Sequence, residues 1–192
     1  MPQPNLSFLE EARDAALGTW ALVLGRQEAP RYFDFSMRGV IGSFIALIIG
    51  IGVSVFGPML VGVASPAGAA TSMTMLSVVL YVFQIGAAYV VLNMMGRLDG
   101  FMPYLVADNW VNFFVALAGS IAIIFLGGSD IMLIVMGIVA IIIEVNIARR
   151  IVTLAPMQIA IFIVAQVVAN FIGLLLFGGL MLQALGPLPA AS

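Results

Sequence analysis

Amide and carboxylate side chains interrupt otherwise apolar stretches of this 192-residue sequence. The candidates for an intramembrane polar site are Gln84, Glu144, Asn146, Gln166 and Asn170. Polar groups in lipid either bond neighbouring helices together or mark the path of an ion or polar solute. Glu144 lies well inside its apolar stretch, so the most specific function that it could have is to couple transport to a proton or another cation. An ion pair with Arg97, Arg149 or Arg150 is the structural alternative.

A second polar group follows in a segment expected to form a loop. The candidates for a site there are Arg97, Asp99, Asp108, Arg149 and Arg150. Two carboxylates and an arginine could hold a lipid phosphate through a metal. The spacing, however, does not match the longer acidic motif of membrane phosphatidyltransferases. Asp99-Gly100 is also an ordinary turn signal, and Asp108 can cap the following helix. We therefore expect no catalytic residues and no metal site.

The residue types that are missing narrow the chemistry further. The chain has no Cys and no His, which excludes thiol catalysis, the usual zinc ligands and haem held by His. We expect no cofactor. A net charge of −2 gives no basic face for nucleic acid.

The composition requires lipid as the outer solvent. The chain is 63% hydrophobic and 8% charged, whereas a soluble domain carries about 25% charged residues. Its apolar runs are Val40–Val63, Ser72–Met95, Asn109–Leu126, Ile131–Ala148 and Met157–Leu185. Each is near the length of about 20 residues that a helix needs to cross a bilayer. The sequence predicts an all-α polytopic membrane bundle of five transmembrane helices, with the lipid bilayer as its first partner.

The arginines predict the orientation of these helices. Arginines occur before the first run and in alternate gaps, at 97 and at 149–150. Because such residues stay on the cytoplasmic side, we expect a cytoplasmic N-terminus and a periplasmic C-terminus in a bacterial inner membrane. The expected parts are a cytoplasmic segment at 1–38, the bundle at 39–186 and an outside tail at 187–192.

The cytoplasmic segment has the pattern of an amphipathic helix over Ser7–Leu24. Ser7 and Glu10 form a capping box, and Gly25 suits its end. The apolar stripe of this helix is expected to comprise Leu9, Ala12, Ala16, Trp20 and Val23. It can dock on lipid, on the protein's own cytoplasmic ends or on a partner.

Small residues recur every four positions in the first and last spans. These expected helix-packing positions are Gly42, Ala46, Gly50, Ser54, Ala165, Ala169 and Gly173. They allow close backbone approach, within the chain or in a homo-oligomer or a complex with other membrane subunits. The aromatic residues Phe101, Tyr104 and Trp110 are expected in the headgroup belt.

Five spans and an outside C-terminus resemble the Yip family of small membrane proteins. Asp99-Gly100 and Pro103 correspond to part of that family's signature. The segment Arg97–Asn109 with Trp110, and Glu144 before Arg149-Arg150, also resemble uncharacterised bacterial inner-membrane proteins. The resemblance implies membrane organisation or recruitment of partners.

The leading functional expectation is a non-enzymatic scaffold or accessory subunit that acts through helix–helix contacts. The first alternative is a small transporter or channel component that uses the intramembrane polar residues. The second is a lipid-headgroup enzyme. A transporter should have a cavity that reaches the amides, whereas a scaffold should have them packed and satisfied. An enzyme should bring Asp99 and Asp108 into one pocket.

Overall fold

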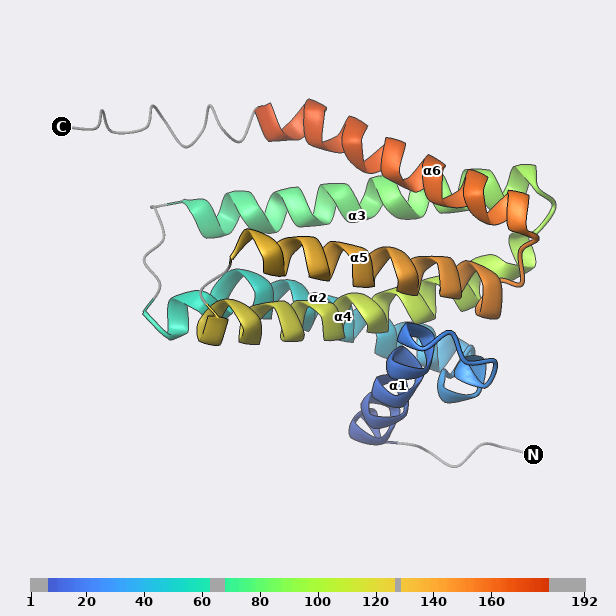
Figure 1. Ribbon diagram of the computed structural model, residues 1–192, viewed down its shortest axis with the longest axis horizontal. Helices are drawn as coiled ribbons and strands as arrows, with labels where there is room; N and C mark the ends of the chain where they lie inside the picture. Colours follow the sequence, from blue (N-terminus) through green and yellow to red (C-terminus); the bar gives the residue numbers. More distant parts are fainter. Residues whose placement is uncertain (1–6, 63–67, 127–128, 180–192) are drawn as a thin grey trace.

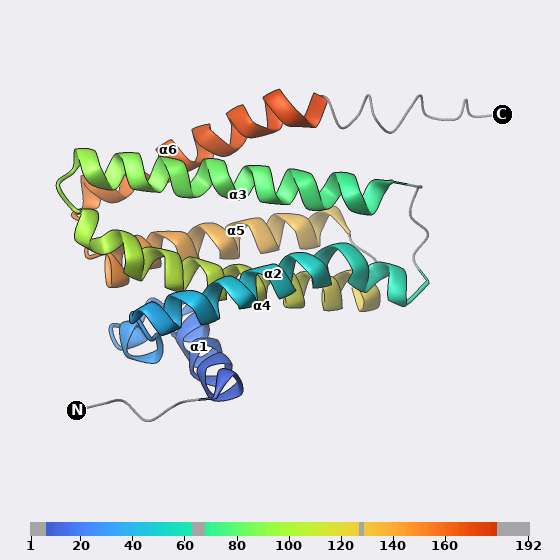
Figure 2. The ribbon, with the colours of Figure 1, turned by 180° about the vertical axis from the view of Figure 1, so that it is seen from behind.

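The computed structural model describes residues 7–62, 68–126 and 129–179. Five helices in this part of the chain are long and apolar enough to cross a membrane. They are α2 (Met37–Leu60), α3 (Ala69–Met94), α4 (Phe101–Leu126), α5 (Asp130–Asn146) and α6 (Pro156–Gly173). They lie side by side along one direction, and α1 (Phe8–Val23) lies across it (Figures 1 and 2). The predicted all-α membrane bundle is confirmed; the predicted tail at 187–192 lies outside the described residues.

Short helical turns join or extend these helices. They are η1 (Ala29–Tyr32), η2 (Leu98–Gly100), η3 (Ile147–Ile151) and η4 (Leu174–Gly178). The helix starts follow ordinary capping rules. Ser7 and Glu10 form the predicted capping box, and the side chains of Ser36 and Ser129 cap α2 and α5.

The described arginines gather at one end of the bundle, which we call the arginine-rich end. It comprises the starts of α2, α4 and α6 and the ends of α3 and α5, and α1 lies beside it (Figure 1). The core is concentrated toward this end. Leu92, Tyr104, Ile143, Ile147 and Phe162 are all fully buried there. Toward the opposite end the helices expose mainly apolar side chains, as lipid contact requires.

Small residues set the closest helix contacts. A Cβ added to Gly50 of α2 would lie 2.9 Å from the Cα of Phe113 in α4. A Cβ on Gly173 of α6 would lie 3.1 Å from the side chain of Leu80 in α3. Gly42 faces the carboxylate of Glu11 in α1 instead of another span. Ala46 is fully buried, whereas Ala165 and Ala169 line an apolar groove between α3 and α6.

The third span begins earlier than its apolar run. α4 starts at Phe101, where Pro103 occupies the first turn and needs no amide partner, instead of at Asn109. Asp108 therefore lies inside a helix and is 2% exposed, so its expected placement in a cytoplasmic loop or at a helix cap is wrong. Tyr104 and Trp110, expected in the headgroup belt, are instead buried in the core.

Candidate functional site: a buried polar network

Asp108 lies at the centre of a polar network inside the bundle. Its Oδ1 accepts a hydrogen bond of 3.2 Å from Gln84 Nε2 of α3. Its Oδ2 accepts one of 3.0 Å from Asn112 Nδ2, one helical turn further along α4. Both partners are neutral amides. The carboxyl group is therefore solvated by fixed dipoles instead of a counter-ion.

Tyr104 continues the network from α4 to α6. Its hydroxyl accepts a hydrogen bond of 3.2 Å from Gln84 Nε2 and donates one of 2.7 Å to Gln166 Oε1. Its ring packs edge-on against Phe162, with centroids 5.2 Å apart. This packing fixes the direction of the hydroxyl, so Tyr104 orients Gln166.

Glu144 of α5 closes the network. Its Oε1 accepts a hydrogen bond of 2.8 Å from Gln166 Nε2, and the Gln166 backbone carbonyl accepts one of 3.1 Å from Asn170 Nδ2. Two carboxyl groups, Asp108 and Glu144, are thus joined through Gln84, Tyr104 and Gln166. Four helices contribute to this one chain of hydrogen bonds.

A separate branch binds α2 to the same region. Tyr81 of α3 donates a hydrogen bond of 2.6 Å to Asn109 Oδ1, and Asn109 Nδ2 donates one of 3.1 Å to Ser43 Oγ of α2. Ser43 then donates to the backbone carbonyl of Val40. All three side chains are satisfied, so this branch holds helices together.

Two pockets meet at the network. One of about 360 Å³ lies among α2, α3, α4 and α6 and is lined by polar groups that include Ser54, Ser77 and Tyr81. The other, of about 230 Å³, lies among α3, α4, α5 and α6 and is lined by Asp108 and Glu144. Gln84, Asn112, Val115 and Asn170 line both pockets.

The two pockets lie at different depths. Ser54 is near the far end of α2, and Ser77 is in the corresponding part of α3. Glu144 lies near the arginine-rich end of α5, and Asp108 lies in the first part of α4. The shared residues are between them. Together the pockets follow the bundle from its far half to the carboxyl groups near the arginine-rich end.

Four of the predicted intramembrane residues come together here: Gln84, Glu144, Gln166 and Asn170. Asn146 does not join them. Its Nδ2 donates a hydrogen bond of 2.8 Å to the backbone carbonyl of Leu22, and so it holds the end of α1. Glu144, for which an arginine partner was the structural expectation, has the amide of Gln166 beside it.

Tyr104 and Asn112 are network residues that sequence reasoning did not name as site candidates, and Asp108 was expected in a loop site instead of this one. They recur every four residues and therefore share one face of α4. That spacing was readable in the sequence. The many polar residues between Arg97 and Asn109 favour a loop instead, so this helical face is not evident from composition.

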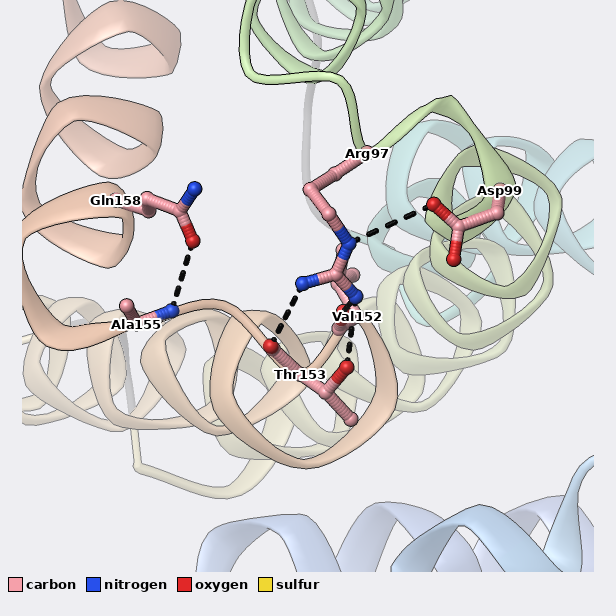
Figure 3. Close-up of polar contacts among 6 residues, drawn as sticks. All are labelled: Arg97, Asp99, Val152, Thr153, Ala155 and Gln158. Atoms are coloured by element: carbon pink, nitrogen blue, oxygen red, sulfur yellow. Dashed lines mark hydrogen bonds and ion pairs between the residues drawn. The ribbon is translucent and has the colours of Figure 1, made fainter.

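The loop candidates are arranged differently (Figure 3). Arg97 donates to the backbone carbonyls of Val152 at 2.6 Å and Thr153 at 3.0 Å, and to Thr153 Oγ1 at 2.8 Å (Figure 3). Its Nε also lies 3.5 Å from the exposed carboxylate of Asp99. Arg97 therefore stabilises the link between α5 and α6, where Thr153 has a φ of 58°.

The remaining loop candidates form no site with Asp99. Arg149 is exposed, and the Nε of Arg150 is buried without a hydrogen-bond partner among the described residues. Asp99 lies on the exposed turn η2, whereas Asp108 is buried within α4. In the described part of the chain, no group of three or more Asp and Glu residues could hold a metal ion.

Comparisons with protein-family models, with curated protein sequences and with solved structures gave no match.

Proposed function

We propose that this membrane protein is a small cation-coupled transporter or a subunit of one, with the proton as the simplest coupling ion. The observation that carries the proposal is the position of Asp108 and Glu144. Both line a pocket inside the bundle, and neutral amides are their partners. A carboxyl group at membrane depth is expensive, and such residues mark ion and proton paths.

The meeting of the two pockets supports the same proposal. Gln84, Asn112 and Asn170 lie where they join. Amide side chains offer both donors and acceptors, so they can replace the hydration of a small polar solute. Glu144 and Asp108 would take up or release the coupling proton on the arginine-rich side of this point.

A scaffold is the second candidate, supported by the saturation of the network. Gln84, Tyr104 and Gln166 all make hydrogen bonds between helices, and Asn170 bonds within α6. Such bonds hold helices together at about 0.6 kcal/mol each. Contacts with other membrane subunits, or a homo-oligomer, would follow from this candidate. A lipid-headgroup enzyme is no longer supported as a candidate, because Asp99 is exposed and Asp108 is buried, so the two carboxylates do not share one pocket.

Proton flux separates the two candidates. The purified protein would be reconstituted into liposomes that contain a pH-sensitive dye, and a pH gradient and membrane potential would be imposed. We expect flux above that of protein-free liposomes, and its loss in Glu144→Gln and Asp108→Asn. Asp99→Asn is the matched control, because Asp99 is exposed and lines neither pocket. Wild-type flux equal to that of empty liposomes would contradict proton transport and favour the scaffold.

The orientation in a bacterial inner membrane, with a cytoplasmic N-terminus, belongs to the same proposal. Gathering of the arginines at one end supports it. In a chain without Cys, single-Cys variants at Arg26 and Ser129 test it, because these residues lie at opposite ends of the bundle. We expect an impermeant thiol reagent to label Ser129→Cys in intact cells and to leave Arg26→Cys unlabelled. Labelling of Arg26→Cys but not of Ser129→Cys would show the opposite orientation in the membrane.

A further inference from the structure

Helix α1 has two faces with different surroundings. Its inner face carries Glu11, Ala15, Gly18, Thr19 and Leu22, all buried against the protein. Most of these side chains are small, so the backbone of α1 comes close to its neighbours. This face accounts for the docking of α1 on the bundle.

Two contacts fix the ends of α1. At its start, the ring of Phe8 packs on Trp110 of α4, with centroids 5.6 Å apart. At its end, Asn146 of α5 donates to the carbonyl of Leu22. Because α4 and α5 are both spans, α1 is held at a fixed place beside the arginine-rich end.

The outer face of α1 is a continuous stripe of large side chains. Its apolar members are Leu9 at 78% exposed, Leu17 at 47%, Trp20 at 60% and Leu24 at 48%. Arg13 is also exposed and lies between Leu9 and Leu17 in the same helical row. No other part of the described residues covers this stripe.

We propose that the outer stripe of α1 lies in the boundary between headgroups and acyl chains of the bilayer that the five spans cross. α1 lies across the bundle axis, as a helix in the plane of a membrane must (Figures 1 and 2). Trp and Arg suit this depth, where an apolar body meets a polar layer. Helix α1 is thus held between protein on one face and lipid on the other.

The start of α2 supports lipid as the occupant over a second protein chain. Met37 and Ile41 are exposed on its first turns, so the lipid-facing surface of that span begins at the end where α1 lies. The outer stripe of α1 exposes large apolar side chains at this same end of the bundle. Arg13 within the stripe would lose its solvation against a protein, whereas in a bilayer it reaches phosphate groups.

Spin labelling tests the proposal independently of any transport activity. A nitroxide on Leu17→Cys in liposomes should collide more with oxygen, which concentrates in lipid, than with a water-soluble nickel chelate. A label on Gln27→Cys, beyond the end of α1 and exposed, is the matched control and should show the opposite preference. Preference for nickel at Leu17, or protection from both reagents as a protein partner would give, would overturn the proposal.

Tryptophan fluorescence provides a second test that needs no label. The difference between the wild-type protein and Trp20→Phe isolates Trp20, since Trp110 is the other tryptophan and is buried. We expect lipids brominated near the headgroup end of their acyl chains to quench most of the Trp20 signal, and aqueous iodide to quench little. Strong quenching by iodide without quenching by brominated lipid would contradict the lipid contact.

Discussion

The hydroxyl of Tyr104 in α4 donates a 2.7 Å hydrogen bond to Gln166 in α6, and Gln166 in turn donates to Glu144 in α5. The orientation of one amide thus depends on a tyrosine and sets the surroundings of a carboxyl group. Gln166 is itself buried, so it has no ready substitute for either partner.

Tyr104→Phe should destabilise the bundle. The change keeps the ring contact with Phe162 but leaves Gln166 Oε1 buried without its donor, at a cost of about 1–3 kcal/mol. Tyr89→Phe is the matched control, because Tyr89 is half exposed. Unfolding by SDS titration in mixed micelles measures both variants. Equal stability of the two would show that the Tyr104 bond contributes nothing.

Gly50→Ala should weaken the contact between α2 and α4. The new methyl group would lie 2.9 Å from Phe113 Cα, so the helices must separate. Overpacking of this kind costs about 1–3 kcal/mol. Gly52→Ala is the control, since a Cβ there meets nothing within 4 Å. Thermal unfolding in detergent should show a lower midpoint for Gly50→Ala alone, and similar midpoints would count against close packing at Gly50.

The docking of α1 on the bundle should weaken as the pH rises from acidic to neutral values. Burial raises the pKa of Glu11, and the neighbouring carboxylate of Asp34 adds to this effect, while a hydrogen bond from Trp110 and the charge of Arg38 oppose it. When α1 is undocked, Glu11 loses its proton at a lower pH than when α1 is docked. The contribution of Glu11 to docking is therefore fully present below its ordinary pKa of 4.5, and it is progressively lost as the pH rises toward the raised pKa of the docked state.

Glu11→Gln should remove most of this pH dependence and strengthen docking at neutral pH. Glu10→Gln is the control, because Glu10 is exposed and serves the capping box. Hydrogen exchange of the α1 amides between pH 4 and 8, corrected for the intrinsic pH dependence of exchange, measures docking. Protection in wild type that increases with pH would contradict the sign of this prediction.

Arg97→Lys should loosen the link between α5 and α6. A guanidinium group can donate to the Val152 and Thr153 carbonyls together, whereas an ammonium group lacks that planar fork. Partial exposure of Arg97 reduces the expected loss to about 1–2 kcal/mol. Arg149→Lys, at an exposed position, is the control. Unfolding by SDS titration should separate the two variants, and identical curves would exclude a clamp role for Arg97.

The five spans could be predicted because lipid imposes length and hydropathy on any helix that crosses it. The same reasoning failed at Asp108. An apolar run ends where polar residues begin, although a helix whose polar face points into a bundle continues past that point. The spacing of four between Tyr104, Asp108 and Asn112 carried the missing information, but the partners of that face come from two other helices, α3 and α6.

The faces of α1 show a second limit of sequence reasoning. Large residues such as Leu9 and Trp20 dominated the predicted apolar stripe. In the structure, the buried residues are Ala15 and Leu22, which belong to the neighbouring face of the helix, and Leu9 and Trp20 are exposed. Close packing of helices selects small side chains, whereas contact with lipid tolerates large ones, and hydropathy alone does not distinguish these two apolar environments.

The buried core is concentrated toward the arginine-rich end, so the helices have a pivot at that end. Tyr104, Ile143 and Phe162 are buried there, whereas the opposite ends expose mainly apolar side chains and the pocket of about 360 Å³ lies between the middle parts of the helices. Rotation of a helix about a fixed point displaces its distant end most. Opening of the bundle would therefore be a splaying motion, with its greatest amplitude on the side remote from α1.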